Sequence, residues 1–359
     1  MSMKYARINK DIGLCIRNFS KDFKELDIHI NYDENDMSKF SFMIIGPEKK
    51  YDNTLHTNFN TPFFGGYYIF AIKFPDEYPI KPPEMGFKTA FKQWRCHPNF
   101  YNIGCGPITE LGTKVCLTMI NTFGSEDWTP SRRLHEIILQ IQERFDTCPI
   151  NHEPGYEKKV VTDEDIINVN LNIEYFNYIL GIFEMMKNND PYVLPFRSKM
   201  EESFIQKYPK LINRIMELKE KYNNKVINTT KYGLVPDMCN KLEFDKLLVK
   251  FEEKYFELTG EKSKLLDNIN MSSKVEEKVE KVEKVEKVDE NKKNKKIEKK
   301  EITTNLNSEL NVNDTTTKIK KPSASLYPID YIYKDENGKE WIIKHNKANR
   351  KWWYAYKKI

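Results

Sequence analysis

The sequence predicts an α+β fold, with an N-terminal helix, a four-stranded antiparallel meander and C-terminal helices. Apolar residues recur at helical spacing over residues 3–19, which predicts the first helix. Four strand-like stretches follow between residues 28 and 89, and the third alternates with the period of two that is typical of strands. The connections between them are too short for helical crossovers, so neighbouring strands are expected to run antiparallel.

Apolar runs mark the predicted strands and prolines interrupt them. The strands are predicted at Ile28–Tyr32, Phe40–Ile45, Tyr67–Phe74 and Met85–Thr89. One face of the third would carry Tyr68, Phe70, Ile72 and Phe74, and the other Tyr67, Ile69, Ala71 and Lys73. Residues 75–83 are rich in proline, which lacks an N–H and fixes φ, so a stiff surface loop is predicted there.

Helices are predicted for the middle of the chain. Thr129 is the expected N-cap of the first, with Pro130 at its first position, where a missing N–H costs nothing. This helix should end before Cys148-Pro149, because the residue before proline disfavours the helical region. Residues 164–258 show mixed helical periodicity and are predicted to form a cap on the preceding domain. The expected buried stripe of the first helix is Leu134, Ile137, Ile138, Ile141 and Phe145.

The C-terminal part of the chain changes character twice. Residues 262–325 lose their aromatics and contain a Val-Glu-Lys repeat, so they cannot bury enough apolar surface to offset ordering entropy. Disorder is predicted, with a transient charged helix as the second choice. The tail from residue 326 is predicted to be a small β module, because Asn337-Gly338 is a strong hairpin signal between two apolar runs. Its aromatics are first of all its core, with a peptide-binding groove as the alternative.

Composition limits the class of protein. The 359 residues carry a net charge of +5 from 58 basic and 53 acidic residues, a balance that argues against dedicated nucleic-acid binding. Six cysteines occur without a CxxC pair, and no apolar run is long enough to span a bilayer. These features predict a reducing compartment, the cytoplasm, with the nucleus as the alternative because of Lys292-Lys293 and Lys295-Lys296. Frequent Lys, Asn, Ile and Tyr indicate an A/T-rich genome.

Three short motifs between residues 97 and 130 carry the chemical signal. They are His97-Pro98-Asn99, then Lys114-Val115-Cys116-Leu117, then Trp128-Thr129-Pro130. A lone cysteine is more often a small buried hydrophobe than a nucleophile, and an Asn after His-Pro is more often a turn former. Their order is more specific than any one of them.

With Pro62, Gly65-Gly66, Tyr78-Pro79 and Pro82-Pro83 on the N-terminal side, this order resembles the ubiquitin-conjugating enzyme family and its UBC fold. The segment His152-Glu153-Pro154-Gly155-Tyr156-Glu157 resembles the large hybrid conjugating-enzyme/ligases of that family. The resemblance implies a UBC catalytic core at 1–157 and, more loosely, a helical extension at 158–260. Composition and the turn signal predict the linker at 261–325 and the β module at 326–359. The links at 49–61 and 99–116 are longer than the family pattern.

The resemblance implies a cysteine-dependent transfer of ubiquitin, with ligase character as a further option. Cys116 would take ubiquitin from an activating enzyme as a thioester and pass it to a substrate lysine. Asn99 would donate to the tetrahedral oxyanion or hold the active-site loop. Because a lysine of pKa about 10.4 is almost entirely protonated at neutral pH, Glu153 is expected to orient the amine and take its proton. His152 is the alternative base.

The resemblance also implies partners: ubiquitin, the activating enzyme, ligases and protein substrates, without a membrane. Basic residues of the first helix, Lys4, Arg7 and Lys10, are candidates for docking the activating enzyme. Ile80 would contact ligases together with Pro130 and Ser131, and His97, Pro98 and Trp128 would support the site. No cofactor or metal is expected in this chain, since ATP is used by the activating enzyme.

Other interpretations stay open at this point. Cys105 lies nearer to the His-Pro-Asn triplet than Cys116 does and is the alternative nucleophile. A zinc site built from Cys96, His97, Cys105 and Cys116 lacks the usual paired-ligand spacing. A ubiquitin-like modifier in place of ubiquitin, or a non-catalytic ubiquitin- or peptide-binding module, are the remaining alternatives. Variants of the last kind lack the cysteine, so Cys116 argues against it.

Overall fold

A computed structural model describes residues 3–34, 36–37, 39–52, 55–124, 127–227, 240–263, 332–334, 340–345 and 351–355. The chain divides into two compact units, residues 1–278 and 279–359, which are described separately. Apart from its first three residues, the predicted linker at 261–325 lies outside the described residues. Within the described part, no helix is long and apolar enough to cross a membrane.

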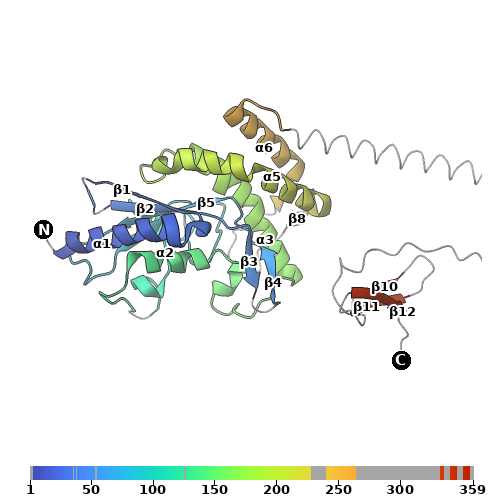
Figure 1. Ribbon diagram of the computed structural model, residues 1–359, viewed down its shortest axis with the longest axis horizontal. Coiled ribbons are helices and arrows are strands. Elements are labelled where there is room, and N and C mark those ends of the chain that lie inside the picture. The colour runs from blue at the N-terminus through green and yellow to red at the C-terminus, as the bar shows by residue number, and fades with distance from the viewer. Residues whose placement is uncertain are drawn as a thin grey trace, which may run out of the picture. The chain divides into compact units, whose positions relative to one another are not determined.

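A five-stranded antiparallel sheet is the centre of the first unit (Figure 1). Its order is β1-β2-β5-β6-β7, from β1 (Ile28–Tyr32), β2 (Lys39–Ile45), β5 (Tyr67–Lys73), β6 (Glu84–Phe87) and β7 (Thr113–Lys114). The first four are the predicted strands. The fifth was not predicted, because two residues are too few to show an alternation. It pairs with β6 and brings Cys116 to the end of the sheet.

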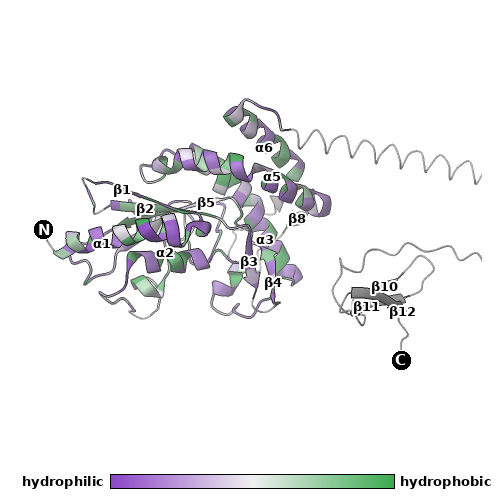
Figure 2. Cartoon of the chain, viewed as in Figure 1, coloured by the Kyte–Doolittle hydropathy of each residue, from purple (hydrophilic) through white to green (hydrophobic). Residues whose placement is uncertain are grey.

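One face of the sheet is covered by α1 (Met3–Arg17) and α2 (Leu134–Glu143) (Figure 1). The predicted alternation of β5 is confirmed, since Tyr68, Phe70 and Ile72 belong to this core and are fully buried. Aromatic stacking fills the space: the Phe70 ring lies 5.0 Å from the rings of both Phe42 and Phe100. In Figure 2, α1 and α2 carry both hydrophilic and hydrophobic residues, as expected of helices with one buried face.

The predicted cap packs on the opposite face of the sheet and also contributes residues to the first core. Its helices are α3 (Glu164–Phe176), which continues as a π-helical segment over Asn177–Glu184, α4 (Met185–Lys187), α5 (Arg197–Tyr222) and α6 (Phe244–Thr259). Tyr67 and Ile69, the alternate residues of β5, pack into this second core with Met200. The Tyr67 hydroxyl donates to the Met200 carbonyl at 2.7 Å. A short hairpin of β8 (Val226–Ile227) and β9 (Asn240–Lys241) lies between α5 and α6 in the chain. The exact domain boundaries stay predictions.

The start of α2 differs from the prediction. The helix begins at Leu134 rather than at Pro130, and the Glu136 carboxylate accepts a hydrogen bond from the Arg133 N–H at 2.8 Å. The carbonyls of Pro130 and Arg132 accept hydrogen bonds from the Arg7 guanidinium of α1, so they are not used in a first helical turn. This contact joins residues more than a hundred positions apart, and no local signal could reveal it. The predicted buried stripe is confirmed.

Two smaller β structures complete the described chain. The long link after β2 forms a hairpin of β3 (Lys49–Asp52) and β4 (Thr57–Asn60), which was not predicted. In the second unit, β10 (Ile332–Lys334), β11 (Glu340–His345) and β12 (Lys351–Ala355) pair antiparallel in that order. A small β module is what the sequence predicted here, and the residues around Trp352-Trp353-Tyr354 supply its third strand, while the predicted Asn337-Gly338 turn lies outside the described residues.

Candidate functional site

Cys116 and Asn99 hold each other at the end of β7. The Cys116 N–H donates to the Asn99 carbonyl at 2.8 Å, and the Asn99 side-chain amide donates to the Cys116 carbonyl at 2.9 Å. Phe100 forms a β-bridge with Val115, and both are buried. Asn99 lies in the turn that precedes Phe100 and is half-buried, as is Tyr101. Cys116 itself is 3% exposed.

His97 shapes the turn that carries Asn99. Its Nδ1 accepts the Asn99 backbone N–H at 3.0 Å, and its ring lies 4.7 Å from the Phe100 ring and 4.9 Å from the His152 ring. Burial holds the pKa of His97 well below its ordinary value, and the nearby charges of His152, Arg144 and Arg95 lower it further. A neutral imidazole that accepts at Nδ1 fixes the turn. We assign His97 to the support of the site.

Glu153 comes to the same place from a different part of the chain. It follows a short 3₁₀ turn, Pro149–His152, and its carboxylate is 3.9 Å from the Arg95 guanidinium with a side chain that is 33% exposed. Tyr101 shows how close these groups are to Cys116. The pKa of Tyr101 is raised by a hydrogen bond with Cys116, by burial and by the charges of Cys116 and Glu153, whereas Arg95 lowers it.

Tyr101 and Arg95 were missed in the sequence. The Arg95 guanidinium lies 4.6 Å from the centre of the Tyr101 ring and donates to the Pro98 carbonyl at 2.7 Å. Tyr101 follows the Asn99 turn by two residues in the chain, but only the fold shows that it lies near Cys116. Arg95 likewise gave no signal in the sequence, since its contacts depend on the fold around it.

The alternative base His152 has both ring nitrogens occupied. Its Nδ1 lies 2.7 Å from the Arg144 guanidinium and its Nε2 lies 2.7 Å from the Asp146 carboxylate. Arginine can only donate, so Nδ1 accepts and Nε2–H donates to Asp146. This arrangement anchors the turn before Glu153 and leaves no nitrogen to take a proton from a lysine. Of the two candidate bases, Glu153 is the one with a free approach.

The structure does not assemble the zinc alternative. Cys96 and His97 are buried, whereas Cys105 is exposed on a turn whose flanking Gly104 and Gly106 have φ of 98° and 113°. Among the described residues, no group of three His, Cys, Asp or Glu side chains is placed to share a metal ion. All four residues proposed as ligands are described, and the structure does not bring them together as a metal site.

Two loops that contain predicted partner residues are joined through Trp128. The indole N–H of Trp128 donates to the Pro79 carbonyl at 2.9 Å, which places the loop of Ile80 beside the loop of Pro130 and Ser131. Ile80 is 72% exposed, and Pro130 and Ser131 are also exposed. These side chains are therefore available on one surface.

The three basic residues of α1 that were predicted to dock the activating enzyme have different environments. Lys10 is exposed, and Lys4 pairs with the Asp76 carboxylate at 2.9 Å. Arg7 is 12% exposed and donates to the fully buried Asp11 carboxylate at 2.8 Å as well as to the α2 entry loop. We therefore assign Arg7 to the scaffold, which leaves Lys4 and Lys10 as docking candidates.

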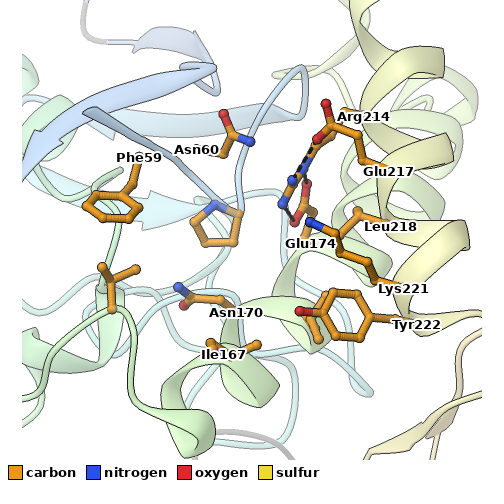
Figure 3. A pocket seen from close by; sticks show the side chains of 13 residues that line it. Phe59, Asn60, Ile167, Asn170, Glu174, Arg214, Glu217, Leu218, Lys221 and Tyr222 are labelled. Atoms are coloured by element: carbon orange, nitrogen blue, oxygen red, sulfur yellow. Dashed lines mark hydrogen bonds and ion pairs between the residues drawn. The ribbon is translucent and has the colours of Figure 1, made fainter. Parts of the chain in front are cut away.

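A cavity of about 220 Å³ lies at the boundary between the core and its cap (Figure 3). It is lined by β4, α3 and α5, and includes none of the residues around Cys116. The Glu174 carboxylate of α3 accepts two hydrogen bonds from the Arg214 guanidinium of α5, at 2.8 and 2.9 Å. Figure 3 shows this pair on the cavity wall beside Glu217. The cavity marks where cap and core meet and is separate from the thiol site.

Comparisons with known proteins agree with this geometry. The family model "Ubiquitin-conjugating enzyme" matches residues 7–164. The human "Ubiquitin-conjugating enzyme E2 Z" is 30% identical over 177 residues, 49% of this chain and 44% of that protein. The Caenorhabditis elegans "Probable ubiquitin-conjugating enzyme protein 17" is 31% identical over 168 residues, 45% of this chain and 20% of that protein. The chain therefore spans about half the length, or less, of these relatives.

Solved structures include similar chains. The E2 domain of a Toxoplasma gondii ubiquitin conjugating enzyme is 22% identical, with a TM-score of 0.32, and the match covers 49% of this chain and 98% of that domain. A Plasmodium falciparum ubiquitin conjugating enzyme E2 is also 22% identical, with a TM-score of 0.28 and coverage of 40% and 83%.

Proposed function

Since residues 7–164 form a domain of the ubiquitin-conjugating enzyme family with the predicted α+β UBC fold, we propose that this chain carries ubiquitin on Cys116. The Cys116 thiolate attacks the carbonyl carbon of the ubiquitin thioester on an activating enzyme, whose thiolate leaves. A lysine amine of a protein substrate then attacks the new thioester. An isopeptide bond forms, and the Cys116 thiolate leaves.

The observation that carries this proposal is the pair of hydrogen bonds between Asn99 and Cys116, with Tyr101 and Glu153 beside them. A cysteine that is only a core residue needs no such surroundings. Here the Asn99 amide bonds the Cys116 backbone, and the Tyr101 phenol lies near both Cys116 and the partly exposed Glu153 carboxylate. Cys116 is 3% exposed, and Tyr101 lies close enough to it for their interaction to raise the pKa of Tyr101.

Glu153 supports the second step. A free lysine amine with a pKa of about 10.4 is neutral in roughly one molecule in a few thousand at neutral pH, so the attack needs a group that takes its proton. The Glu153 carboxylate is partly exposed at the mouth of the site and can accept that proton as the amine attacks. Asn99 supports the same step by holding the backbone around the thioester.

Exposed side chains support two docking sites in the same proposal. Lys10 of α1 is exposed and would meet the activating enzyme, together with Lys4, whose side chain is 12% exposed and paired with Asp76; Ile80 with Pro130 and Ser131 would meet a ligase. Ligase character of the chain itself, and the identity of the modifier, stay predictions from the resemblance.

A charging assay tests the function. The full chain is incubated with activating enzyme, ATP and ubiquitin, and the products are separated with and without a thiol reductant. We expect a reductant-sensitive adduct in the wild type and in the matched control Cys105→Ala, and none in Cys116→Ala. Cys116→Ser should form a reductant-resistant oxyester. An adduct that persists in Cys116→Ala and is lost in Cys105→Ala would overturn the assignment.

A further inference from the structure

Arg95 contacts three separate parts of the thiol site. Its Nη2 donates to the Pro98 carbonyl at 2.7 Å and lies 3.9 Å from Glu153 Oε2, and its Cζ lies 4.6 Å from the centre of the Tyr101 ring. The side chain is 15% exposed. Among the described residues, its Nε is buried without a hydrogen-bond partner. Such an unpaired donor costs stability, so packing alone does not explain a cation at this position.

We propose that Arg95 is a positioning residue for the transfer of ubiquitin to lysine, which holds Glu153 and Tyr101 at the thiol and keeps the incoming amine neutral by its charge. The proposal rests on the function proposed above and adds a residue to it. The positioning role follows from the three contacts, because one planar guanidinium bridges the His97–Asn99 turn, the Tyr101 ring and the Glu153 segment.

The electrostatic role follows from the place of the charge. An acceptor lysine that reaches Cys116 while Glu153 takes its proton must come close to the Arg95 guanidinium. A like charge nearby disfavours the ammonium form and so lowers the pKa of the amine, and partial burial weakens solvent screening of this effect. A lowering of about one unit would raise the neutral fraction at neutral pH about tenfold.

Other charged groups around Arg95 must be considered in the same test. The groups that face Arg95 or the Tyr101 ring are Glu153, Tyr101, His97, Cys116 and Lys114, and the Lys114 ammonium lies 5.7 Å from the ring centre. Lys114 is exposed and the pKa of His97 is held low by burial, so neither replaces Arg95 as the shielded cation of the site.

The test compares the pH dependence of discharge in three variants of the full chain. Wild type, Arg95→Gln, Arg95→Lys and the control Arg17→Gln, which removes an exposed charge at the end of α1, are first charged with ubiquitin. Discharge to free lysine is then followed from about pH 6 to about pH 10, across the range where the amine titrates. Arg95→Gln should charge normally and discharge about tenfold more slowly at neutral pH, with its rate midpoint about one unit higher.

Arg95→Lys keeps the charge and loses the planar contacts. It should therefore be slower at every pH with the wild-type midpoint, and Arg17→Gln should match the wild type throughout. If Arg95→Gln does not fold, the test rests on Arg95→Lys. A discharge midpoint displaced from the wild-type pH in Arg95→Lys overturns the electrostatic role. A wild type that charges while Arg95→Gln discharges with an unchanged profile overturns this inference alone. A wild type that forms no adduct overturns the proposed function and this inference with it.

Discussion

Asn99 and Cys116 exchange two hydrogen bonds, from the Cys116 N–H to the Asn99 carbonyl at 2.8 Å and from the Asn99 amide to the Cys116 carbonyl at 2.9 Å. These two bonds join the His97–Asn99 turn to Cys116, which lies two residues beyond the end of β7. In this state the amide donates to the backbone, so it holds the loop. A tetrahedral oxyanion on the thioester would compete for the same donor.

Removal of that donor should affect transfer more than charging. We expect Asn99→Ala to form the ubiquitin adduct at close to the wild-type rate and to discharge it to lysine about a hundredfold more slowly. The free energy of unfolding should fall by about 1 kcal/mol, the net value of one hydrogen bond. Single-turnover charging and discharge assays, together with urea unfolding, measure the three quantities. An equal loss in charging and discharge would contradict a selective role.

Glu153 and His152 can be separated by pH. Glu153→Gln removes the proton acceptor, so discharge to lysine should slow at neutral pH and recover as the amine loses its proton at higher pH. His152→Asn can still accept from Arg144 but cannot reach Asp146, so it should lower stability and leave the shape of the pH profile unchanged. Discharge rates at several pH values decide. If the pH profile of discharge changes shape in His152→Asn and keeps its shape in Glu153→Gln, then His152 rather than Glu153 is the proton acceptor.

His97 should make stability depend on pH. Burial lowers the pKa of His97 in the folded chain, so below the ordinary value of about 6.5 the unfolded chain binds a proton that the folded chain does not. Stability is therefore complete above about pH 6.5 and falls as the pH decreases, by up to about 1.4 kcal/mol per unit, until the folded pKa is reached. Urea unfolding at several pH values should show a smaller slope in His97→Asn. The same slope in both proteins would rule out His97 as its source.

Removing one partner of the Glu174–Arg214 pair should destabilise the chain more than replacing both partners by apolar residues. Glu174 is 4% exposed as a side chain, and Tyr178 donates to it at 2.8 Å in addition to Arg214. Arg214→Met should reduce the free energy of unfolding by about 3–5 kcal/mol, because it leaves a buried carboxylate without its charge partner. Glu174→Leu combined with Arg214→Met should recover much of this loss, whereas Arg17→Met should have little effect. A double variant as unstable as Arg214→Met would show that the pair is not the cause.

The sequence by itself determined most of the regular structure and singled out Cys116 as the candidate site cysteine. The Tyr67–Lys73 strand was predictable because alternate residues must face opposite sides of a sheet, and here the two sides enter two different cores. The buried stripe from Leu134 to Phe145 was predictable because residues at helical spacing lie on one face of a helix. Cys116, Asn99 and Glu153 were found by their motifs, each of which is contiguous in the chain.

Only the tertiary structure decided the features that depend on distant partners. The start of α2 was set by Arg7 of α1, and the two residues of β7 became a strand because β6 lies beside them. His152 likewise has both ring nitrogens occupied only because the fold brings Arg144 and Asp146 to it. The three contacts of Arg95 depend on the fold in the same way. Local periodicity reports which side of an element is buried, but a hydrogen bond or ion pair between distant segments leaves no periodic trace in either of them.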